Sequence, residues 1–480
     1  MKALSYLGAV LLFFASQAIA ADNRWTIHEW GTFTSLQNES GDALGGINTD
    51  DEPVPQFVHR LSYGLLLPPT EIPASFGKGI PVCHPDVNMR LETPVIYFHP
   101  PASQTGIQKI NVAVEFRGGW LTEFYPDAKA SAPGFVQNHI GSTVAFSATG
   151  PLGPISRLTK SELKWNDLCV GGDWSFTNTT EHVWTSPRAV KAASVQTASA
   201  ESEKFLFYRG IGHIDAPLRV ARDANTGELL FRSQLEELPG NQPLPIRAMW
   251  LVDIQPNGKL AFRALPSISL DHNSKKILAH TRADFDSTDY SESNLEKLET
   301  SLRTALVDDG LFTDEAQALL NTWELSYFKS PGVRVFFLVP RAWTDSVLPL
   351  QVSQPAQINR VMVGRIELVT PEQRNNLREL GRFSFTRVKS DAVDMQLLFS
   401  NALRRDNGAT WTQLTSGRTP LSATISVPKT YQTYLDLGRF RNALILDEAA
   451  HHPTPSLTNF IATYRLQAFK PVATVDFSFK

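Results

Sequence analysis

Three segments of the sequence alternate apolar and polar residues on both sides of a short turn, and this pattern constrains the fold more than any other feature. They are residues 110–126, 218–233 and 248–265, with turns at residues 118–119, 225–227 and 256–258. Alternation places successive side chains on opposite faces of a strand, and glycine supplies the backbone angles of a tight turn. We therefore predict antiparallel hairpins, and a mainly β fold in which residues 21–284 form a β-sandwich or a pair of packed sheets with long loops.

From about residue 285 the pattern changes to mixed α and β. Three helices are predicted, over residues 293–306, after Thr313 and over residues 371–380. The first has a capping box of Ser293 and Glu296, and the third has one of Thr370 and Gln373. Two buried strands are predicted at residues 333–340 and 360–369. Residues 285–480 are therefore expected to form a second, mixed α+β domain.

The first twenty residues have the composition of a secretion signal. Lys2 precedes an apolar run over residues 4–15, and Ala18 and Ala20 form the small-x-small pattern of a signal peptidase site. We therefore expect residues 1–20 to be removed and the mature protein to be periplasmic or extracellular. No later apolar run approaches the ~20 residues of a membrane-spanning helix. The formal net charge of -3, with both signs mixed along the chain, gives no indication of a nucleic-acid partner.

The two cysteines, Cys83 and Cys169, are expected to form a disulfide. An exported protein meets an oxidising compartment, in which a pair of cysteines is bridged by default. Two free thiols, or two thiolate metal ligands, are the alternatives. Structural zinc sites usually have cysteines at tighter spacing, which favours the disulfide.

His28, Glu29 and Trp30 lie side by side in the segment IHEWGTFTS. In an extended strand His28 and Trp30 face one side, while Glu29 shares the other side with apolar residues. A buried carboxylate needs a cation, a metal or several donors. Three arginines are candidates for the cation: Arg90, Arg117 and Arg209. Glu29 is therefore either half of a structural Glu–Arg brace or a catalytic base.

Five of the eleven histidines precede residue 140, namely His28, His59, His84, His99 and His139. Imidazoles from separate strands can converge on one zinc or copper ion. The candidate metal ligands are His28, His84 and His99, with Asp86 two residues after His84. Glu29 or Glu123 is the candidate base for a metal-bound water. The alternative is a set of unrelated histidines, because no compact ligand spacing is visible.

Aromatic and acidic residues form a third group in the amino-terminal half. The group contains Trp120, Glu123, Phe124, Tyr125, Trp165, Trp174 and Trp184. Aromatic rings beside carboxylates are typical of sugar-binding sites, and a glycosidase needs two carboxylates at a defined separation. The same rings can equally belong to the core. The candidate ligand-binding residues are Trp30, Arg117, Trp120 and Tyr125, and the long connections at residues 36–56, 68–90 and 126–200 are where a binding site is expected.

Four segments of the chain resemble a family of uncharacterised secreted bacterial proteins marked by a His-Glu-Trp-Gly-Thr-Phe-Thr segment. They are IHEWGTFTS, RLETPVIYF, WLTEFYP and EKFLFYRG. With RVFFLVP and RVMVGRIEL, the similarity extends over about residues 24–445. The resemblance implies an exported protein that matches the family over most of the mature chain, and it assigns no catalytic residue.

These patterns favour an exported protein with a metal-assisted hydrolytic site that acts on an extracytoplasmic polymer or its fragments. The G-x-S-x-G, P-loop and H-E-x-x-H motifs are absent from the sequence, which excludes the commonest signatures of hydrolases, nucleotide-binding proteins and zinc proteases. Two alternatives remain. One is a non-catalytic secreted protein that binds a glycan or peptide, and the other is an extracytoplasmic structural or assembly factor.

Overall fold

The computed structural model describes most of the chain. The described residues are 24–49, 54–60, 76–77, 80–81, 83–132, 135–140, 143–148, 155–235, 242–272, 275–384, 403–407, 410–413, 424–427, 429–464 and 466. The expected signal sequence, residues 1–20, lies outside them.

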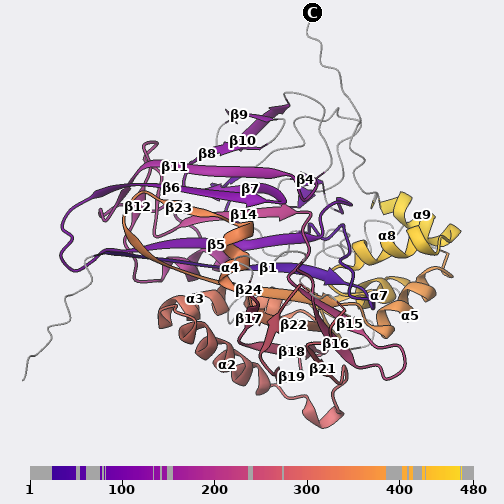
Figure 1. Cartoon of the computed structure of the whole chain (residues 1–480). Coiled ribbons are helices and arrows are strands. Elements are labelled where there is room, and N and C mark those ends of the chain that lie inside the picture. The colour runs from indigo at the N-terminus through magenta and orange to yellow at the C-terminus, as the bar shows by residue number, and fades with distance from the viewer. Residues whose placement is uncertain are drawn as a thin grey trace, which may run out of the picture.

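Strands dominate the fold, with 36% of the residues in strands and 25% in helices, which confirms the mainly β prediction. The largest unit is a nine-stranded sheet through the middle of the molecule (Figure 1). Its strands are, in spatial order, β19 (Leu260–Leu265), β18 (Met249–Ile254), β22 (Gly332–Leu338), β24 (Ala356–Leu368), β1 (Trp25–Gln37), β5 (Met89–His99), β14 (Leu206–Gly212), β7 (Gly119–Tyr125) and β2 (His59–Arg60). Strands from both sides of residue 284 join this sheet, so the two expected regions share it.

β1 lies at the centre of the nine-stranded sheet, between β5 and β24. It pairs antiparallel with β5 and parallel with β24, in a register that sets His28 beside Asn359 and Glu29 beside Arg360. All but one of its 13 residues are buried. The polar side chains of β1 are therefore removed from water and need partners within the protein.

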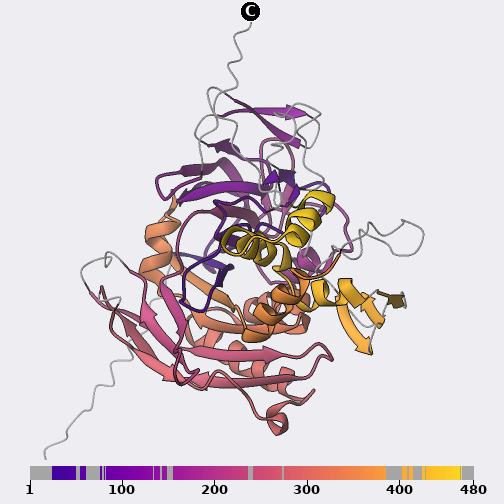
Figure 2. The same cartoon turned by 90° about the vertical axis from the view of Figure 1, so that its right-hand side faces the viewer.

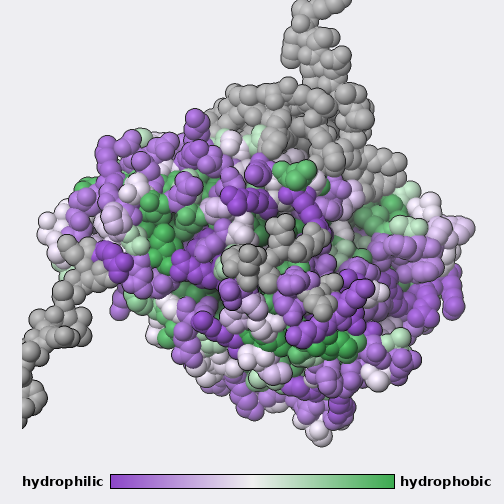
Figure 3. Space-filling model, viewed as in Figure 1, coloured by the Kyte–Doolittle hydropathy of each residue, from purple (hydrophilic) through white to green (hydrophobic). Residues whose placement is uncertain are grey.

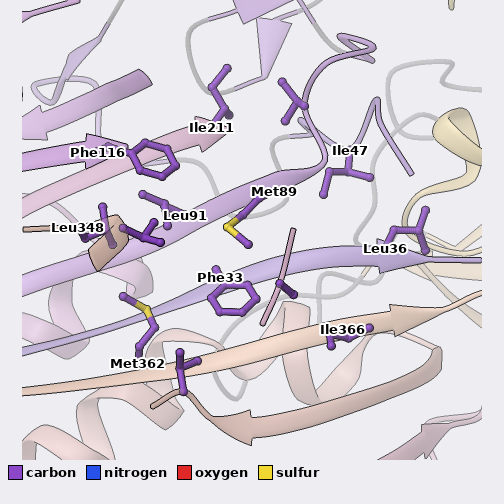
Figure 4. Close-up of a cluster of buried hydrophobic side chains, with 14 of the residues drawn as sticks. Phe33, Leu36, Ile47, Met89, Leu91, Phe116, Ile211, Leu348, Met362 and Ile366 are labelled. Carbon is purple, nitrogen blue, oxygen red and sulfur yellow. The ribbon is translucent and has the colours of Figure 1, made fainter. Parts of the chain in front are cut away.

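A second sheet packs against the nine-stranded one. Its strands are β13 (Ser202–Glu203), β12 (Val195–Gln196), β11 (Lys160–Val170), β6 (Gln108–Arg117) and β23 (Leu350–Val352), with β8 (Lys129–Ser131) beside β11. Phe116 of β6 lies over Gly119 of β7 and Gly212 of β14, where an added Cβ would be only 2.2 and 2.7 Å from its ring. The two sheets thus share a core, in which Phe116, Leu91 and Ile211 lie near one another (Figure 4). The description of this region as a sandwich stays a prediction.

Two of the three predicted hairpins are confirmed, and the third is wrong. β15 (Leu218–Arg222) pairs with β16 (Leu229–Ser233), and β18 pairs with β19. β6 and β7 belong instead to different sheets, because the chain crosses from one sheet to the other at Gly118, whose φ of 102° favours glycine. Two alternating strands around a glycine turn occur both in a hairpin within one sheet and in a connection between two sheets. The local pattern therefore could not distinguish a hairpin from a crossing.

Five smaller sheets complete the described strands. β21 (Ala279–Thr281) extends the β15–β16 hairpin. The others are β17 (Leu244–Ile246) with β20 (Ile268–Leu270), β9 (Phe135–Ile140) with β10 (Thr143–Ala148), β3 (Phe76–Gly77) with β4 (Ile80–Pro81), and β25 (Leu403–Asn407), β26 (Thr410–Gln413) and β27 (Thr424–Ser426).

Helices cover one face of the nine-stranded sheet and also gather at one of its ends. On the face lie α2 (Asn294–Asp308), α3 (Thr313–Thr322) and the π-helical turn η4 (Glu324–Lys329), which share a second core with β18, β22 and β24. At the end lie α5 (Pro371–Leu380), α7 (Lys429–Asp436), α8 (Arg441–His451) and α9 (Pro455–Tyr464) (Figure 2). The shorter helices are α1 (His182–Arg188), η3 (Ser287–Asp289) and α4 (Arg341–Val347).

The predicted helices and buried strands of the carboxy-terminal region are present. α5 has the predicted capping box, because Gln373 N donates to Thr370 Oγ1 at 3.2 Å and Thr370 N donates to Gln373 Oε1 at 2.9 Å. Ser293 precedes α2, but its hydroxyl makes no capping hydrogen bond, so the box predicted with Glu296 is not formed. A single helix boundary can therefore be correct while its expected cap is not.

The face of the molecule in Figure 3 is mostly hydrophilic, with apolar residues in separate patches. Among the described helices, none combines the length and the apolar composition that a membrane crossing requires.

The predicted disulfide between Cys83 and Cys169 is wrong. Both cysteines are free. Cys83 is buried in the connection before β5, whereas Cys169 lies in β11 and pairs across the second sheet with Lys109 and Gln196. Burial raises the pKa of Cys83 to about 12, so this thiol is protonated at neutral pH, and neither cysteine belongs to the group of possible metal ligands among the described residues.

Candidate metal centre

His28 and His99 meet on one face of the nine-stranded sheet. His99 ends β5 directly opposite Thr26 of β1, two residues before His28. Residues two apart in a strand face the same side, and cross-strand partners share a face, so the register brings both imidazoles together. Their ring centres lie 5.2 Å apart. Two of the three histidines predicted as ligands are therefore neighbours.

Glu315, in the first turn of α3, joins the two imidazoles. Its Oε2 lies 2.6 Å from His28 Nδ1 and its Oε1 lies 2.9 Å from His99 Nε2. The same carboxylate accepts the backbone N–H of Phe312 at 2.8 Å, which ties it to the start of the helix. Burial alone would raise the pKa of Glu315, but the hydrogen bonds from His28, His99 and Phe312 outweigh it, so the pKa lies below its ordinary value. Glu315 is therefore an anion between two imidazoles.

Asn359 of β24 fixes the tautomer of His28. Its Nδ2 lies 3.0 Å from His28 Nε2 and donates to Gly310 O at 3.3 Å. A carbonyl oxygen only accepts, so the amide atom near Gly310 is the nitrogen, and His28 Nε2 must accept from it. The proton of a neutral His28 therefore resides on Nδ1 and is donated to Glu315.

The centre is almost closed to solvent. His28 is 1% exposed, Glu315 is 0% exposed and His99 is 14% exposed. Phe312 covers the two imidazoles, with ring centres 4.5 Å from His28 and 4.8 Å from His99, while its own outer side is open and leaves it 46% exposed. Phe312 therefore separates a polar site from water.

These three side chains have the donor set of a transition-metal site. One ligand atom from each of His28, His99 and Glu315 lies within 4.8 Å of the others. Two imidazole nitrogens and a carboxylate oxygen suit zinc and other divalent metals. Ligand atoms ~2.0–2.1 Å from one ion are about 3.3 Å apart in a tetrahedron, so His28 Nδ1 and Glu315 Oε2 would separate slightly and the Nδ1 proton would leave. The residues present supply the donor set for a metal, and ligand atoms that lie within 4.8 Å of one another would adjust to these separations around an ion.

His84 and Asp86 are not part of this group. They precede β5, whereas His99 ends it, and an 11-residue strand spans roughly 35 Å at ~3.3 Å per residue. His84 Nδ1 instead accepts the backbone N–H of Asp86 at 3.2 Å. His59 pairs with Glu201, with Nε2 2.8 Å from Oε2, and the side chain of His139 lies outside the described residues. Glu315, rather than His84, is thus the third member of the group that contains His28 and His99.

His84 is expected to make the protein less stable in mild acid. Burial lowers the pKa of His84 to about 4 from an ordinary 6.5, with Asp86 opposing part of the shift. Below pH 6.5 the unfolded chain binds a proton that the folded protein does not accept until about pH 4. The contribution of His84 to the free energy of unfolding is therefore fully present above pH 6.5. It falls by roughly 3 kcal/mol as the pH drops to 4. Urea unfolding of wild type and His84→Gln across this range should show a shallower pH dependence in the variant, and equal slopes would refute a neutral, buried His84.

Glu29 lies on the opposite face of β1 and forms the predicted brace with an unexpected partner. Arg360 Nε donates to its Oε2 at 2.5 Å, and Tyr208 Oη donates to its Oε1 at 2.6 Å. Arg360 also donates from Nη1 to Asp345 at 2.8 Å. Burial raises the pKa of Tyr208, and the charge of Glu29 raises it further, so the phenol stays protonated as the donor. Both oxygens of Glu29 are occupied, and its side chain points away from His28.

The three arginines proposed for that brace are engaged elsewhere. Arg90 pairs with Glu92 at 2.9 Å, Arg209 with Glu123 at 3.5 Å, and the exposed Arg117 with Glu115 at 2.5 Å. Glu123 also lies 3.4 Å from Arg60. Its strand, β7, is three strand spacings from β1, or roughly 14 Å, whereas glycosidase carboxylates are ~5–9.5 Å apart. Glu29 and Glu123 therefore do not form a catalytic pair.

The aromatic residues proposed for ligand binding lie mostly in the core. Trp30, Trp120 and Tyr125 are buried. So are Phe124, Trp165 and Trp184, whereas Trp174 is half-buried. Trp165 donates its indole N–H to Pro126 O at 3.0 Å, and Trp184 donates to Glu203 at 2.7 Å. The alternative interpretation, that these rings belong to the core, holds for the buried members of this set.

A second group of buried charges lies on the carboxy-terminal half of β24. Arg365 and Arg334 both pair with Glu367, with Arg334 Nε 3.1 Å from its Oε1. Arg365 also lies 4.5 Å above the centre of the Tyr327 ring. Burial, reinforced by the positive charge of Arg439, lowers the pKa of Arg365 to about 9. Guanidinium groups have no lone pair for a metal, so this cluster does not compete with the histidines as a metal site.

No protein-family model matches the chain, and no curated protein matches it significantly. A function is therefore proposed from the geometry of the site alone.

Proposed function

We propose that this chain is an exported, metal-dependent hydrolase with one zinc ion held by His28, His99 and Glu315. One observation carries the proposal: two imidazoles and a carboxylate from β1, β5 and α3 converge within 4.8 Å in an almost closed site. Export rests on the composition of residues 1–20, and membership of the His-Glu-Trp-Gly-Thr-Phe-Thr family rests on the quoted segments. The proposed substrate is an extracytoplasmic polymer or its fragments.

A bound zinc ion would polarise a substrate carbonyl or phosphoryl group and lower the pKa of a water molecule toward neutrality. The residues of the chain prepare that chemistry. Glu315 contributes the negative charge that holds a divalent cation, and Phe312 keeps bulk water from the imidazoles. Low local polarity strengthens every charge interaction in such a site. Glu29 does not act as the base, because Arg360 and Tyr208 occupy both of its oxygens.

Asn359 would have to respond to metal binding at His28. When His28 Nδ1 gives up its proton to bind a metal, the remaining ring proton resides on Nε2 and becomes a donor. A half-turn of the Asn359 amide would present Oδ1 to that proton, but it would also turn Oδ1 toward Gly310 O and break the hydrogen bond that Nδ2 donates there at 3.3 Å. The hydrogen bonds of Asn359 therefore match the metal-free tautomer of His28, and metal binding would break one of them.

Metal content is the decisive measurement. Protein purified without chelator and loaded with zinc should contain about one equivalent by mass spectrometry after dialysis. His28→Ala and Glu315→Gln should each lose at least roughly nine tenths of it, because two remaining ligands bind weakly. His84→Ala is the matched control, as another buried histidine that lies beyond the opposite end of β5, and it should keep its zinc.

Circular dichroism would establish that each variant is folded. An absence of stoichiometric metal in loaded wild type would refute the proposal and leave Glu315 as a structural brace between two histidines. Equal loss in His84→Ala and His28→Ala would place the ion elsewhere. The burial of Trp30, Trp120 and Tyr125 weakens the alternative of a glycan-binding protein, because these rings offer no exposed stacking surface.

A further inference from the structure

A pocket of about 300 Å³ lies beside the metal centre, along an edge of β24. β22 pairs with β24 only as far as Leu338 and Val363, so the preceding residues of β24 pair with no described strand on that side. Asn359 and Arg360 from this stretch line the pocket together with Arg247, Asp309 and Arg341. Pockets of this size are at the lower end of those that hold small molecules.

The charged residues of the lining favour an anion. Three guanidinium groups and one carboxylate line the pocket. Arg247 Nη1 lies 3.3 Å from Asp309 Oδ1, and Arg341 Nε lies 3.3 Å from Asp345, which is outside the lining. Arg247 and Arg341 are largely exposed, so they can turn toward a ligand at little cost. Asp309 is the one carboxylate in the lining, and burial raises its pKa although Arg247 opposes the shift.

Arg360 adds a buried donor that is unused among the described residues. Its Nε and Nη1 donate to Glu29 and Asp345, but its Nη2 is buried and has no acceptor within the described part of the chain. A buried donor without an acceptor is energetically unfavourable. A carboxylate or phosphate oxygen that reaches Nη2 would remove this cost, and planar guanidinium groups match both oxyanions.

Apart from Asn359, the remaining lining is apolar and indicates that the ligand also has a carbon body. It comes from Leu244, Pro245 and residues 338–342, which include Leu338, Val339, Pro340 and Ala342. Asn359 connects the pocket to the centre, because it lines the pocket and hydrogen-bonds His28 at 3.0 Å. Arg360 likewise connects it to Glu29 on the other face of β1. Both polar residues of the His-Glu-Trp segment are thus one contact away from the same pocket.

We infer that this pocket binds a small molecule with a carboxylate or phosphate group, held by Arg247, Arg341 and Arg360. The ligand is an oxyanion with a short apolar body. The inference goes beyond the proposed function, because the pocket and its arginines need no metal.

Isothermal titration of metal-free protein, with the chelator removed, tests this binding. Inorganic phosphate and butyrate are the two probes, at constant ionic strength, and they separate a phosphate ligand from a carboxylate ligand. We expect saturable binding of at least one probe with a Kd below about 10 mM. Arg247→Ala and Arg341→Ala should each raise that Kd roughly tenfold, which corresponds to ~1.4 kcal/mol.

Arg282→Ala is the matched control for Arg341→Ala. Both substitutions break an exposed ion pair between residues four apart, Arg282–Asp286 and Arg341–Asp345, but Arg282 is not in the pocket. It should leave the Kd unchanged. The inference is overturned if neither probe saturates wild type, or if Arg247→Ala and Arg341→Ala bind as well as Arg282→Ala. Because no metal is present, a failure of the metal proposal alone would leave these titrations unaffected.

Discussion

Glu29→Ala is expected to lower the free energy of unfolding by about 3–5 kcal/mol. The substitution leaves the guanidinium of Arg360 buried with only Asp345 as a carboxylate partner, and it removes the acceptor of the Tyr208 hydroxyl. Breaking a buried ion pair from one side has this large effect because the remaining charge stays desolvated. Urea unfolding followed by tryptophan fluorescence measures the change.

The double variant Glu29→Leu/Arg360→Met serves as the internal check. It removes both charges and fills the space with apolar atoms, so it should recover much of the stability lost in Glu29→Ala. Arg282→Ala breaks an exposed pair and should cost less than about 0.5 kcal/mol. A Glu29→Ala protein as stable as Arg282→Ala would show that Glu29 is not a brace, and the carboxylate would return as a candidate base.

Trp184→Ala is expected to cost about 3–5 kcal/mol of unfolding free energy. The indole is fully buried, and its ring centre lies 4.9 Å from Phe207, 5.1 Å from Phe205 and 5.3 Å from Phe57. Truncation removes these contacts and leaves a cavity that a well-packed core cannot fill. It also removes the donor that bonds Glu203 at 2.7 Å. Chemical denaturation of the purified variant and wild type measures this change in the free energy of unfolding.

Trp174→Ala is the control, because Trp174 has the same side chain in the same long connection but is only half-buried. Its loss should cost less than about 1 kcal/mol. Equal effects of the two substitutions would contradict the assignment of Trp184 to the core. They would reopen the interpretation of these tryptophans as a ligand platform.

Elements with local signals could be predicted from the sequence. α5 has its cap, its proline and its stop within a dozen residues, and the structure reproduces all three. The hairpins β15–β16 and β18–β19 likewise depend on a turn and its two flanking strands. The β6–β7 prediction failed because the ring of Phe116 packs on glycines of another sheet, a contact that no local pattern encodes.

The residues of the candidate site could likewise be predicted only in part, because most of their contacts are distant in the sequence. His28 and His99 could be anticipated, because imidazoles in strands are chemically conspicuous. Glu315 could not, since it lies 287 positions from His28 and reads as an ordinary acid in the first turn of a helix. Asn359 and Arg360 are 331 positions from their partners in β1. Their roles depend on the pairing of β24 with β1, which the periodicity of either strand leaves open.

The place of β1 in the sheet also sets an order of folding. One of its two neighbours, β5, begins about fifty residues after the end of β1. The other, β24, begins more than three hundred residues after the end of β1. A growing chain would hold β1 with an open edge until β24, at residues 356–368, has been synthesised. Contacts of such long sequence separation slow folding, and an open strand edge invites pairing with other chains. Shortened forms that end before residue 356 should therefore aggregate rather than fold, and the complete chain should reach its native state slowly.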